Sequence, residues 1–142
     1  MDLAKKRSWQ TAGTEISAYA AEMAKSRGHQ VFCIDLPELD IADRFDVVTI
    51  LDVLEHVSNP RQYLGKANEL LVDGGLLAIN TIDRGSLIAR VLGLKWHLVV
   101  PPEHLNYYTR KNLALMLENN GFKTVSIAKP GKRFSLSRRH GC

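Results

Sequence analysis

The sequence predicts a doubly wound, mainly parallel α/β sheet, and two features of the chain carry this prediction. Short runs of β-branched and aliphatic residues alternate with segments of helical periodicity, which is the pattern of strands joined by crossover helices. The run at residues 47–51 is apolar or β-branched throughout. Such a run is typical of a strand that helices cover on both faces of a parallel sheet.

The expected elements follow the same alternation along the chain. We expect six strands, at residues 9–14, 30–34, 47–51, 76–80, 123–128 and 133–137. Helices are expected to begin at Ala18, Pro60, Asp83 and Arg110. Ser17, Asn59 and Thr109 are suited to cap three of these helices, and Gly28 stands where the first should end in a left-handed conformation. The second helix should stop at residues 73–75, and the last at Gly121.

Length and composition indicate a single domain. The chain has 142 residues, of which 45% are hydrophobic, so it can bury a core of its own. We expect the domain to cover residues 1–137 and residues 138–142 to form a disordered basic tail.

No apolar run approaches the ~20 residues that a membrane-spanning helix needs, and the N-terminus lacks the apolar segment of a signal peptide. Cys33 and Cys142 do not make a disulfide framework. These features predict a cytoplasmic protein.

The positive charge of the chain is confined to its ends. Residues 8–128 hold 11 Lys and Arg against 14 Asp and Glu, whereas the remaining residues hold 8 and 1. A protein that binds nucleic acid would carry a basic face on its folded body. We therefore interpret the basic ends as solvated segments and do not expect a nucleic-acid partner.

Ionisable residues follow the central strand directly. Asp52, Glu55 and His56 stand within five positions of one another. Ligands of open α/β sheets bind just outside the carboxyl ends of such strands. The run is therefore a candidate site, and a polar loop that caps a core strand is the equally weighted alternative.

This region resembles a known family. Phe45-Asp46-Val47-Val48, the run at residues 51–57 and Asn59-Pro60 look like the fourth-strand region of class I S-adenosylmethionine-dependent methyltransferases. The branch that modifies small molecules, lipids or sugars is the most similar, and the resemblance extends over residues 9–136. It implies a methyltransferase that uses S-adenosylmethionine as cofactor and transfers its methyl group to an oxygen, nitrogen or carbon atom of such an acceptor.

The resemblance also implies which residues contact the cofactor. Glu15 matches the carboxylate that accepts from both ribose hydroxyls, and Asp35 would accept from the exocyclic amine of adenine. Ile16 and Leu36 would pack on the faces of the adenine ring. Leu51 and Asp52, at the end of the central strand, complete the expected cofactor set. A surface glutamate ahead of a helix is the alternative interpretation of Glu15.

The acceptor side is expected in the long segment at residues 95–108, which is dense in aromatic residues and histidine. The resemblance places Trp96, His104 and Tyr107 over the acceptor, although Trp96 and Tyr107 are equally consistent with core packing. His56 and His104 are the candidates for a catalytic base. We expect Asp52, His56, His104 and Tyr107 to converge at the carboxyl ends of the strands.

One part of the family pattern has no counterpart. The family begins with a strand and a glycine-rich loop that holds the methionine carboxylate, and nothing here matches either. Binding of S-adenosylmethionine should therefore be weak and depend on Glu15. The missing strand is central in the family's sheet, so we expect an N-terminally truncated sheet in which residues 10–14 pair directly with residues 47–51. A strand donated by a second copy, giving a homodimer, is the alternative.

Three other functions are alternatives to a methyltransferase. A non-catalytic binding or interaction domain with the same fold is the main alternative, and the absent loop leaves enzymatic activity open. A nicotinamide-dependent oxidoreductase would need a Gly-x-Gly-x-x-Gly motif, which is absent. A metal hydrolase is the weakest candidate, because the five histidines, at positions 29, 56, 97, 104 and 140, lack the spacing of metal ligands.

Overall fold

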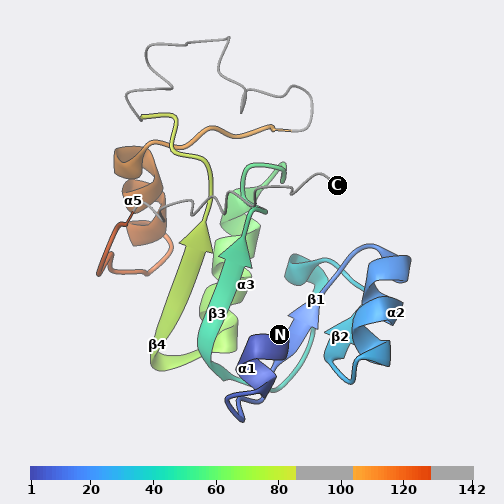
Figure 1. Ribbon diagram of the computed structural model, residues 1–142. Helices are drawn as coiled ribbons and strands as arrows, with labels where there is room; N and C mark the ends of the chain where they lie inside the picture. Colours follow the sequence, from blue (N-terminus) through green and yellow to red (C-terminus); the bar gives the residue numbers. More distant parts are fainter. Residues whose placement is uncertain (86–103, 129–142) are drawn as a thin grey trace, which may run out of the picture.

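A computed structural model of the chain describes residues 1–85 and 104–128. These residues form the strands β1 (Ala12–Thr14), β2 (Gln30–Phe32), β3 (Phe45–Leu51) and β4 (Leu71–Asn80). The α-helices are α1 (Asp2–Lys5), α2 (Ala18–Ser26), α3 (Pro60–Leu70) and α5 (Arg110–Glu118), and a 3₁₀ turn, η1, spans Leu36–Glu38. Figure 1 shows two strand–helix–strand units side by side, with α5 beyond β4.

The two units are built in the same way. In the first, β1 and β2 pair in parallel across helix α2, with Gly13 opposite Val31. In the second, β3 and β4 pair in parallel across helix α3, with Ile50 opposite Ile79. Parallel strands joined by crossover helices define an α/β fold. The predicted fold class is therefore confirmed.

Local signals in the sequence set most of the helix ends. The Ser17 hydroxyl accepts from the backbone N–H of Ala20, as an N-cap residue does. Thr109 forms a reciprocal capping box with Asn112. Gly28 adopts the expected left-handed conformation, with φ 77°. Asn59 precedes α3 as predicted, but its side chain makes no capping hydrogen bond.

Strand β4 begins earlier than the sequence predicts. Helix α3 ends at Leu70, and Leu71 already pairs with Phe45. The register then shifts, because the next pair joins Val47 to Leu76. Gly74 lies within this irregular stretch at φ 76°, where a residue with a side chain would be strained. The glycines thus accommodate a bulge in a paired strand instead of separating the helix from the strand.

The hydrophobic core lies between the β3–β4 pair and helix α3. Its buried members are Ile50, Leu54, Tyr63, Leu64, Ala67 and Tyr108. On the other face of the pair, Val47, Leu51 and Leu76 are 39%, 56% and 52% exposed. The predicted burial of the central strand on both faces is therefore wrong for the residues described, since α3 covers one face only.

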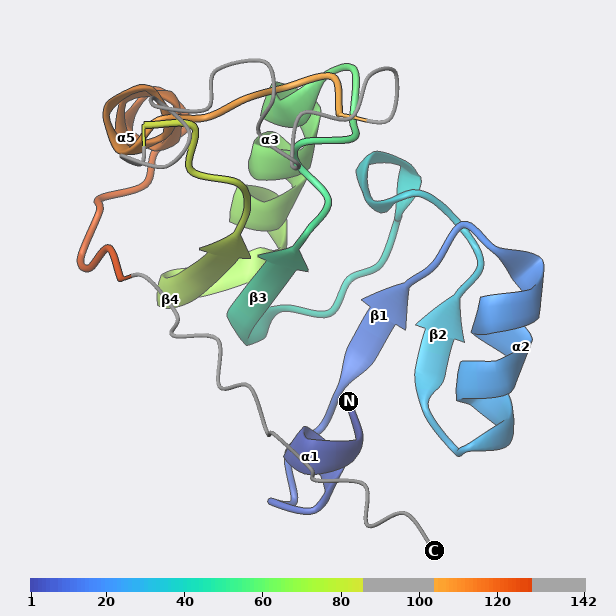
Figure 2. The same ribbon diagram turned by 45° about the horizontal axis from the view of Figure 1, so that its top comes forward.

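The predicted pairing of residues 10–14 with residues 47–51 is also wrong. Among the described residues the strands form two separate two-stranded sheets, β1–β2 and β3–β4 (Figure 2). The units are instead joined at one end, where η1 packs on α3 and Leu36 contacts the core. Side-chain and helix contacts replace the backbone ladder that we expected.

Three further expectations concern the second half of the chain. Residues 123–128 do not form a strand. Asp83 forms an isolated parallel bridge with Tyr108, so no helix begins there. Residues 86–92, the strand at 133–137 and the domain boundary at residue 137 lie outside the described residues. No helix in the described ranges is long and apolar enough to cross a bilayer.

We predict that Leu64→Ala strongly destabilises the fold. Leu64 lies on α3 and is 0% exposed, and removing such a side chain costs about 2–5 kcal/mol. Leu115→Ala on α5 is the matched control, because it is also a helical leucine but is 56% exposed, and it should change stability by less than ~0.5 kcal/mol. Urea denaturation followed by circular dichroism measures both. Equal losses would contradict the assignment of the core.

Candidate functional site

The predicted cofactor residues follow the carboxyl ends of three strands. Glu15 comes directly after β1, Asp35 begins the η1 turn after β2, and Asp52 comes directly after β3. The arrowheads of the four strands point to the same end of the molecule (Figure 2). Three carboxylates thus lie along the edge where ligands bind in open α/β sheets.

Glu15 is held in place by both main chain and side chain. Its backbone N–H donates to the carbonyl of Phe32, which continues the β1–β2 ladder by one bond. Its Oε1 accepts from the backbone N–H of Ser17 at 2.8 Å. The carboxylate therefore sits at the start of α2 and keeps Oε2 available, since nothing in the described part of the chain donates to that oxygen. Ile16 beside it is 75% exposed.

Asp35 has two donors within the protein. Oδ1 accepts from the backbone N–H of Leu36 at 2.8 Å, which caps the η1 turn. The hydroxyl of Tyr63, on α3, lies 2.5 Å from Oδ1 and 2.6 Å from Oδ2. Leu36 itself packs partly against the core. The sequence places Asp35 at the strand end but contains no signal for its contact with Tyr63.

Asp52 adopts an uncommon backbone conformation. Its φ is 54°, in the left-handed region that non-glycine residues seldom occupy and that aspartate tolerates better than most. Its backbone N–H donates to the carbonyl of Asn80 at 2.9 Å, and Asn80 Nδ2 donates to Asp52 Oδ1 at 2.7 Å. These bonds tie together the ends of β3 and β4. Leu51, just before, is 56% exposed.

The turn after β3 is fastened to the segment at residues 104–108. The backbone N–H groups of Leu105 and Asn106 both donate to the carbonyl of Glu55, at 2.7 and 3.0 Å. Asn106 Nδ2 donates to the carbonyls of Leu54 and Val57, at 3.2 and 2.6 Å. The Tyr108 hydroxyl adds a third bond, to the Leu54 carbonyl at 3.1 Å. Segments about fifty positions apart are thereby held side by side.

These bonds bring the histidines together. The ring centroids of His56 and His104 are 4.7 Å apart in an edge-to-face arrangement, and that of Tyr107 is 6.2 Å from His104. The Arg84 guanidinium lies over the Tyr107 ring, 5.8 Å from its centroid. Of the four residues expected to converge, His56, His104 and Tyr107 lie together, whereas the Asp52 side chain accepts a hydrogen bond from Asn80 at the end of β4. Their roles remain predictions, and Trp96 lies outside the described residues.

Sequence reasoning placed Glu55 in the candidate run without a role of its own, and it missed Asn106. Glu55 is 2% exposed, and its carboxylate accepts from the Thr81 hydroxyl at 2.8 Å. Asn106 supplies the amide bonds just described. The position of Glu55 beside His56 in the polar run was a usable signal, whereas nothing in the sequence pairs Asn106 with residues 54 and 57. Within the described ranges, no three His, Cys, Asp or Glu side chains gather as metal ligands.

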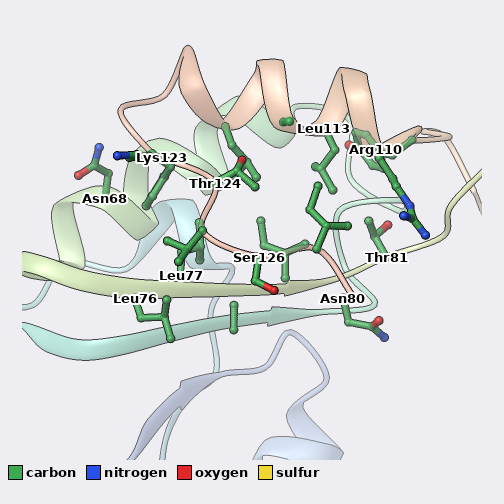
Figure 3. Close-up of a pocket in the computed structure, with 18 of the residues that line it drawn as sticks. Asn68, Leu76, Leu77, Asn80, Thr81, Arg110, Leu113, Lys123, Thr124 and Ser126 are labelled. Atoms are coloured by element: carbon green, nitrogen blue, oxygen red, sulfur yellow. The ribbon is translucent and has the colours of Figure 1, made fainter. Parts of the chain in front are cut away.

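A separate groove of about 1280 Å³ lies between β4, α5 and residues 121–128. Figure 3 shows Leu113 and Thr124 on one side of it and Leu77 on the other. Asp52 lines this groove, but Glu15, Asp35, His56 and His104 do not. Of the described residues of the predicted site, Asp52 is therefore the one that lines this groove.

The parallel α/β units, with carboxylates at the strand ends, are consistent with the Rossmann-like fold of class I S-adenosylmethionine-dependent methyltransferases. Residues 1–127 match the model of a methyltransferase domain family, so the chain belongs to that family. It is 28% identical over 148 residues to a ubiquinone biosynthesis O-methyltransferase of Bradyrhizobium sp. (strain ORS 278), covering 90% of this chain and 57% of that protein.

Two solved structures share the fold. One is a methyltransferase of Thermotoga maritima described as a possible histamine N-methyltransferase, with a TM-score of 0.69, 24% identity, and coverage of 85% of this chain and 58% of that one. The other is a magnesium protoporphyrin IX methyltransferase of Synechocystis PCC 6803 with bound S-adenosylhomocysteine, with a TM-score of 0.66, 19% identity, and coverage of 89% and 60%. The chain thus spans about three-fifths of the length of these proteins.

The sequence leads us to expect S-adenosylmethionine as cofactor, and the chain belongs to a methyltransferase domain family. The residues described fit the adenosine half of S-adenosylmethionine, because the carboxylates of Glu15 and Asp35 are acceptors for ribose hydroxyls and an adenine amine. Both carboxylates retain acceptor capacity beyond their internal hydrogen bonds. The fit is thus to the nucleoside half of the cofactor.

We predict a loss of stability between pH 10 and pH 12 that depends on Tyr108. Burial, aided by the charge of Glu55, raises the pKa of Tyr108 from 10.0 to about 12. The folded state therefore keeps a proton that the unfolded state releases, so the contribution is complete below pH 10 and is lost as the pH rises through 12. The free energy of unfolding of Tyr108→Phe should fall less steeply over this range. Parallel slopes for the two proteins would contradict the prediction.

Proposed function

We propose that this chain holds the adenosine and acceptor sides of an S-adenosylmethionine-dependent O-methyltransferase for a small molecule, lipid or sugar. The observation that carries the proposal is the His56–His104–Tyr107 cluster, which follows the end of β3 as the predicted cofactor residue Asp52 does. Oxygen is chosen as the acceptor atom because the curated relative from Bradyrhizobium is named as an O-methyltransferase.

The adenosine side would use residues from both units. Glu15 would accept from the ribose hydroxyls and Asp35 from the adenine amine, each charge-assisted bond contributing about 1.5–3 kcal/mol. Ile16, Leu36 and Leu51 would offer apolar contacts to the nucleoside, and Asp52 would border it at the end of β3. When bound, S-adenosylmethionine supplies an activated methyl group on its sulfonium.

The acceptor side would prepare a hydroxyl oxygen for attack. His104, fixed beside His56 by the backbone bonds to Glu55, would accept the hydroxyl proton, because imidazole is the side chain suited to proton transfer near neutral pH. Tyr107 and the Arg84 cation would contact the acceptor and stabilise the oxygen as it gains negative charge. In the described part of the chain the buried Tyr107 hydroxyl has no partner, which suits a contact to substrate.

We predict that Glu15→Ala weakens the binding of S-adenosylmethionine about tenfold or more, since the ribose loses a charged acceptor. Glu22→Ala is the matched control: Glu22 is an exposed glutamate on α2 that pairs with Lys25, and its removal should leave affinity unchanged. Titration calorimetry at millimolar cofactor measures both, because we expect weak binding. Submicromolar affinity that survives Glu15→Ala would contradict the placement of the ribose.

Transfer of a radiolabelled methyl group to a panel of catechols, sugars and hydroxylated lipids tests the proposal as a whole. We expect O-methylation of one class, and a loss of turnover of about 10²–10⁴-fold in His104→Asn, the range for a general base. His29→Asn is the control, since His29 directly precedes β2, at the amino end of that strand, and its ring contacts Asp2. Cofactor binding without transfer to any acceptor would favour the non-catalytic alternative instead.

A further inference from the structure

The end of β2 is joined to helix α3 by one short side-chain contact, between residues 28 positions apart. The Tyr63 hydroxyl lies within 2.6 Å of both carboxylate oxygens of Asp35. An ionised carboxylate only accepts, so the phenol is the donor, and a charged acceptor explains the short distances. Tyr63 is 8% exposed and is a member of the core. Its ring is therefore held by packing, and its hydroxyl is a fixed donor.

The two internal donors leave one defined place on Asp35 for a third. Leu36 N–H occupies Oδ1, and the Tyr63 hydroxyl approaches from the side shared by both oxygens. A carboxylate has about four acceptor positions. The outer acceptor position of Oδ2 therefore remains open to a ligand. The donors at the other positions fix the orientation of the carboxylate and thus the direction in which this position points.

We propose that Tyr63 is a positioning residue that sets the base specificity of the adenosine site. By fixing the Asp35 carboxylate, it presents Oδ2 as an acceptor in one direction, which selects a purine with an amino group at C6 over one with a carbonyl group there. This inference rests on the proposed function, because it takes Asp35 as the acceptor for adenine.

The chemistry of the pair supports this discrimination. An amino group at C6 donates to Oδ2, whereas a carbonyl at C6 brings a second acceptor against a charged one. Two acceptors that face each other leave both without a hydrogen bond, and this cost allows a polar site to reject a ligand of similar shape. Burial also raises the pKa of Tyr63, and the Asp35 hydrogen bond adds to that effect, so the phenol keeps its proton at neutral pH.

The test compares S-adenosylhomocysteine with S-inosylhomocysteine, which differ at C6 of the purine, by calorimetric titration of the whole chain. We expect the wild type to prefer the adenine compound by about tenfold or more, and Tyr63→Phe to reduce this ratio to about threefold or less. Tyr108→Phe is the matched control. Its hydroxyl also donates from a buried ring, but to the Leu54 carbonyl, so its ratio should equal that of the wild type.

A purely structural role for Tyr63 would lower stability without changing the ratio, and that result would overturn the inference while leaving the adenosine placement intact. An unchanged ratio in Asp35→Ala, or failure of the wild type to bind either compound, would overturn both the inference and the proposed adenosine side.

Asp35→Asn provides a second test that leaves Tyr63 in place. The Tyr63 hydroxyl and the Leu36 N–H are donors, so they would retain the amide oxygen and turn the amide nitrogen toward the ligand. We expect this variant to prefer S-inosylhomocysteine, whose carbonyl can accept from that nitrogen. A retained preference for S-adenosylhomocysteine would contradict the proposed orientation of the side chain.

Discussion

The proposed acceptor side depends on how the chain satisfies the carbonyl groups of the turn after β3. Leu54 and Glu55 are buried there, beyond the end of the sheet ladder, where an unpaired carbonyl would cost about 1–3 kcal/mol. The segment at residues 105–108 supplies the donors, from two backbone N–H groups, the Asn106 amide and the Tyr108 hydroxyl. The same bonds that satisfy the turn bring His104 against His56. The geometry of the histidine pair thus follows from a requirement of backbone hydrogen bonding.

The proposed adenosine side depends on a different kind of contact. Because β1 and β3 belong to separate sheets, no backbone ladder fixes the first unit to the second among the described residues. The Asp35–Tyr63 hydrogen bond and the packing of Leu36 on the core join the units at the strand ends. A substitution in that small contact should therefore affect the relative position of the units as well as the Asp35 carboxylate.

The parts of the fold that short-range signals determine were predictable. Ser17 and Thr109 cap their helices, and both units have the expected parallel order, because caps and apolar periodicity act over a few residues. The early start of β4 was missed, since two glycines after a helix are equally compatible with a stop and with a bulge inside a paired strand. The predicted hydrogen-bond ladder between β1 and β3 is wrong. It was inferred from the cost of unpaired strand edges, but contacts between η1 and α3 join the two sheets without such a ladder.

The candidate site also has residues whose positions could be predicted from the sequence and contacts that could not. Asp35, Asp52 and His56 stand at the ends of apolar runs, and strand-end topology is enough to place them on one edge. The partners of these residues were not predictable. Tyr63 lies in the core, and helical periodicity can indicate the burial of its ring but contains no information about the partner of its hydroxyl. The same holds for Asn106, because no sequence pattern indicates which carbonyl groups an amide side chain will bind.

Two of the bonds that fasten residues 104–108 to the turn run from main-chain N–H groups to a main-chain carbonyl. Bonds of this kind do not depend on which side chains the bonded residues carry. Substitutions at position 105 can therefore alter the surface beside the proposed acceptor site while the path of the backbone is retained. Over evolutionary time, this arrangement would allow related proteins to change substrate through single replacements, without first acquiring a new loop conformation.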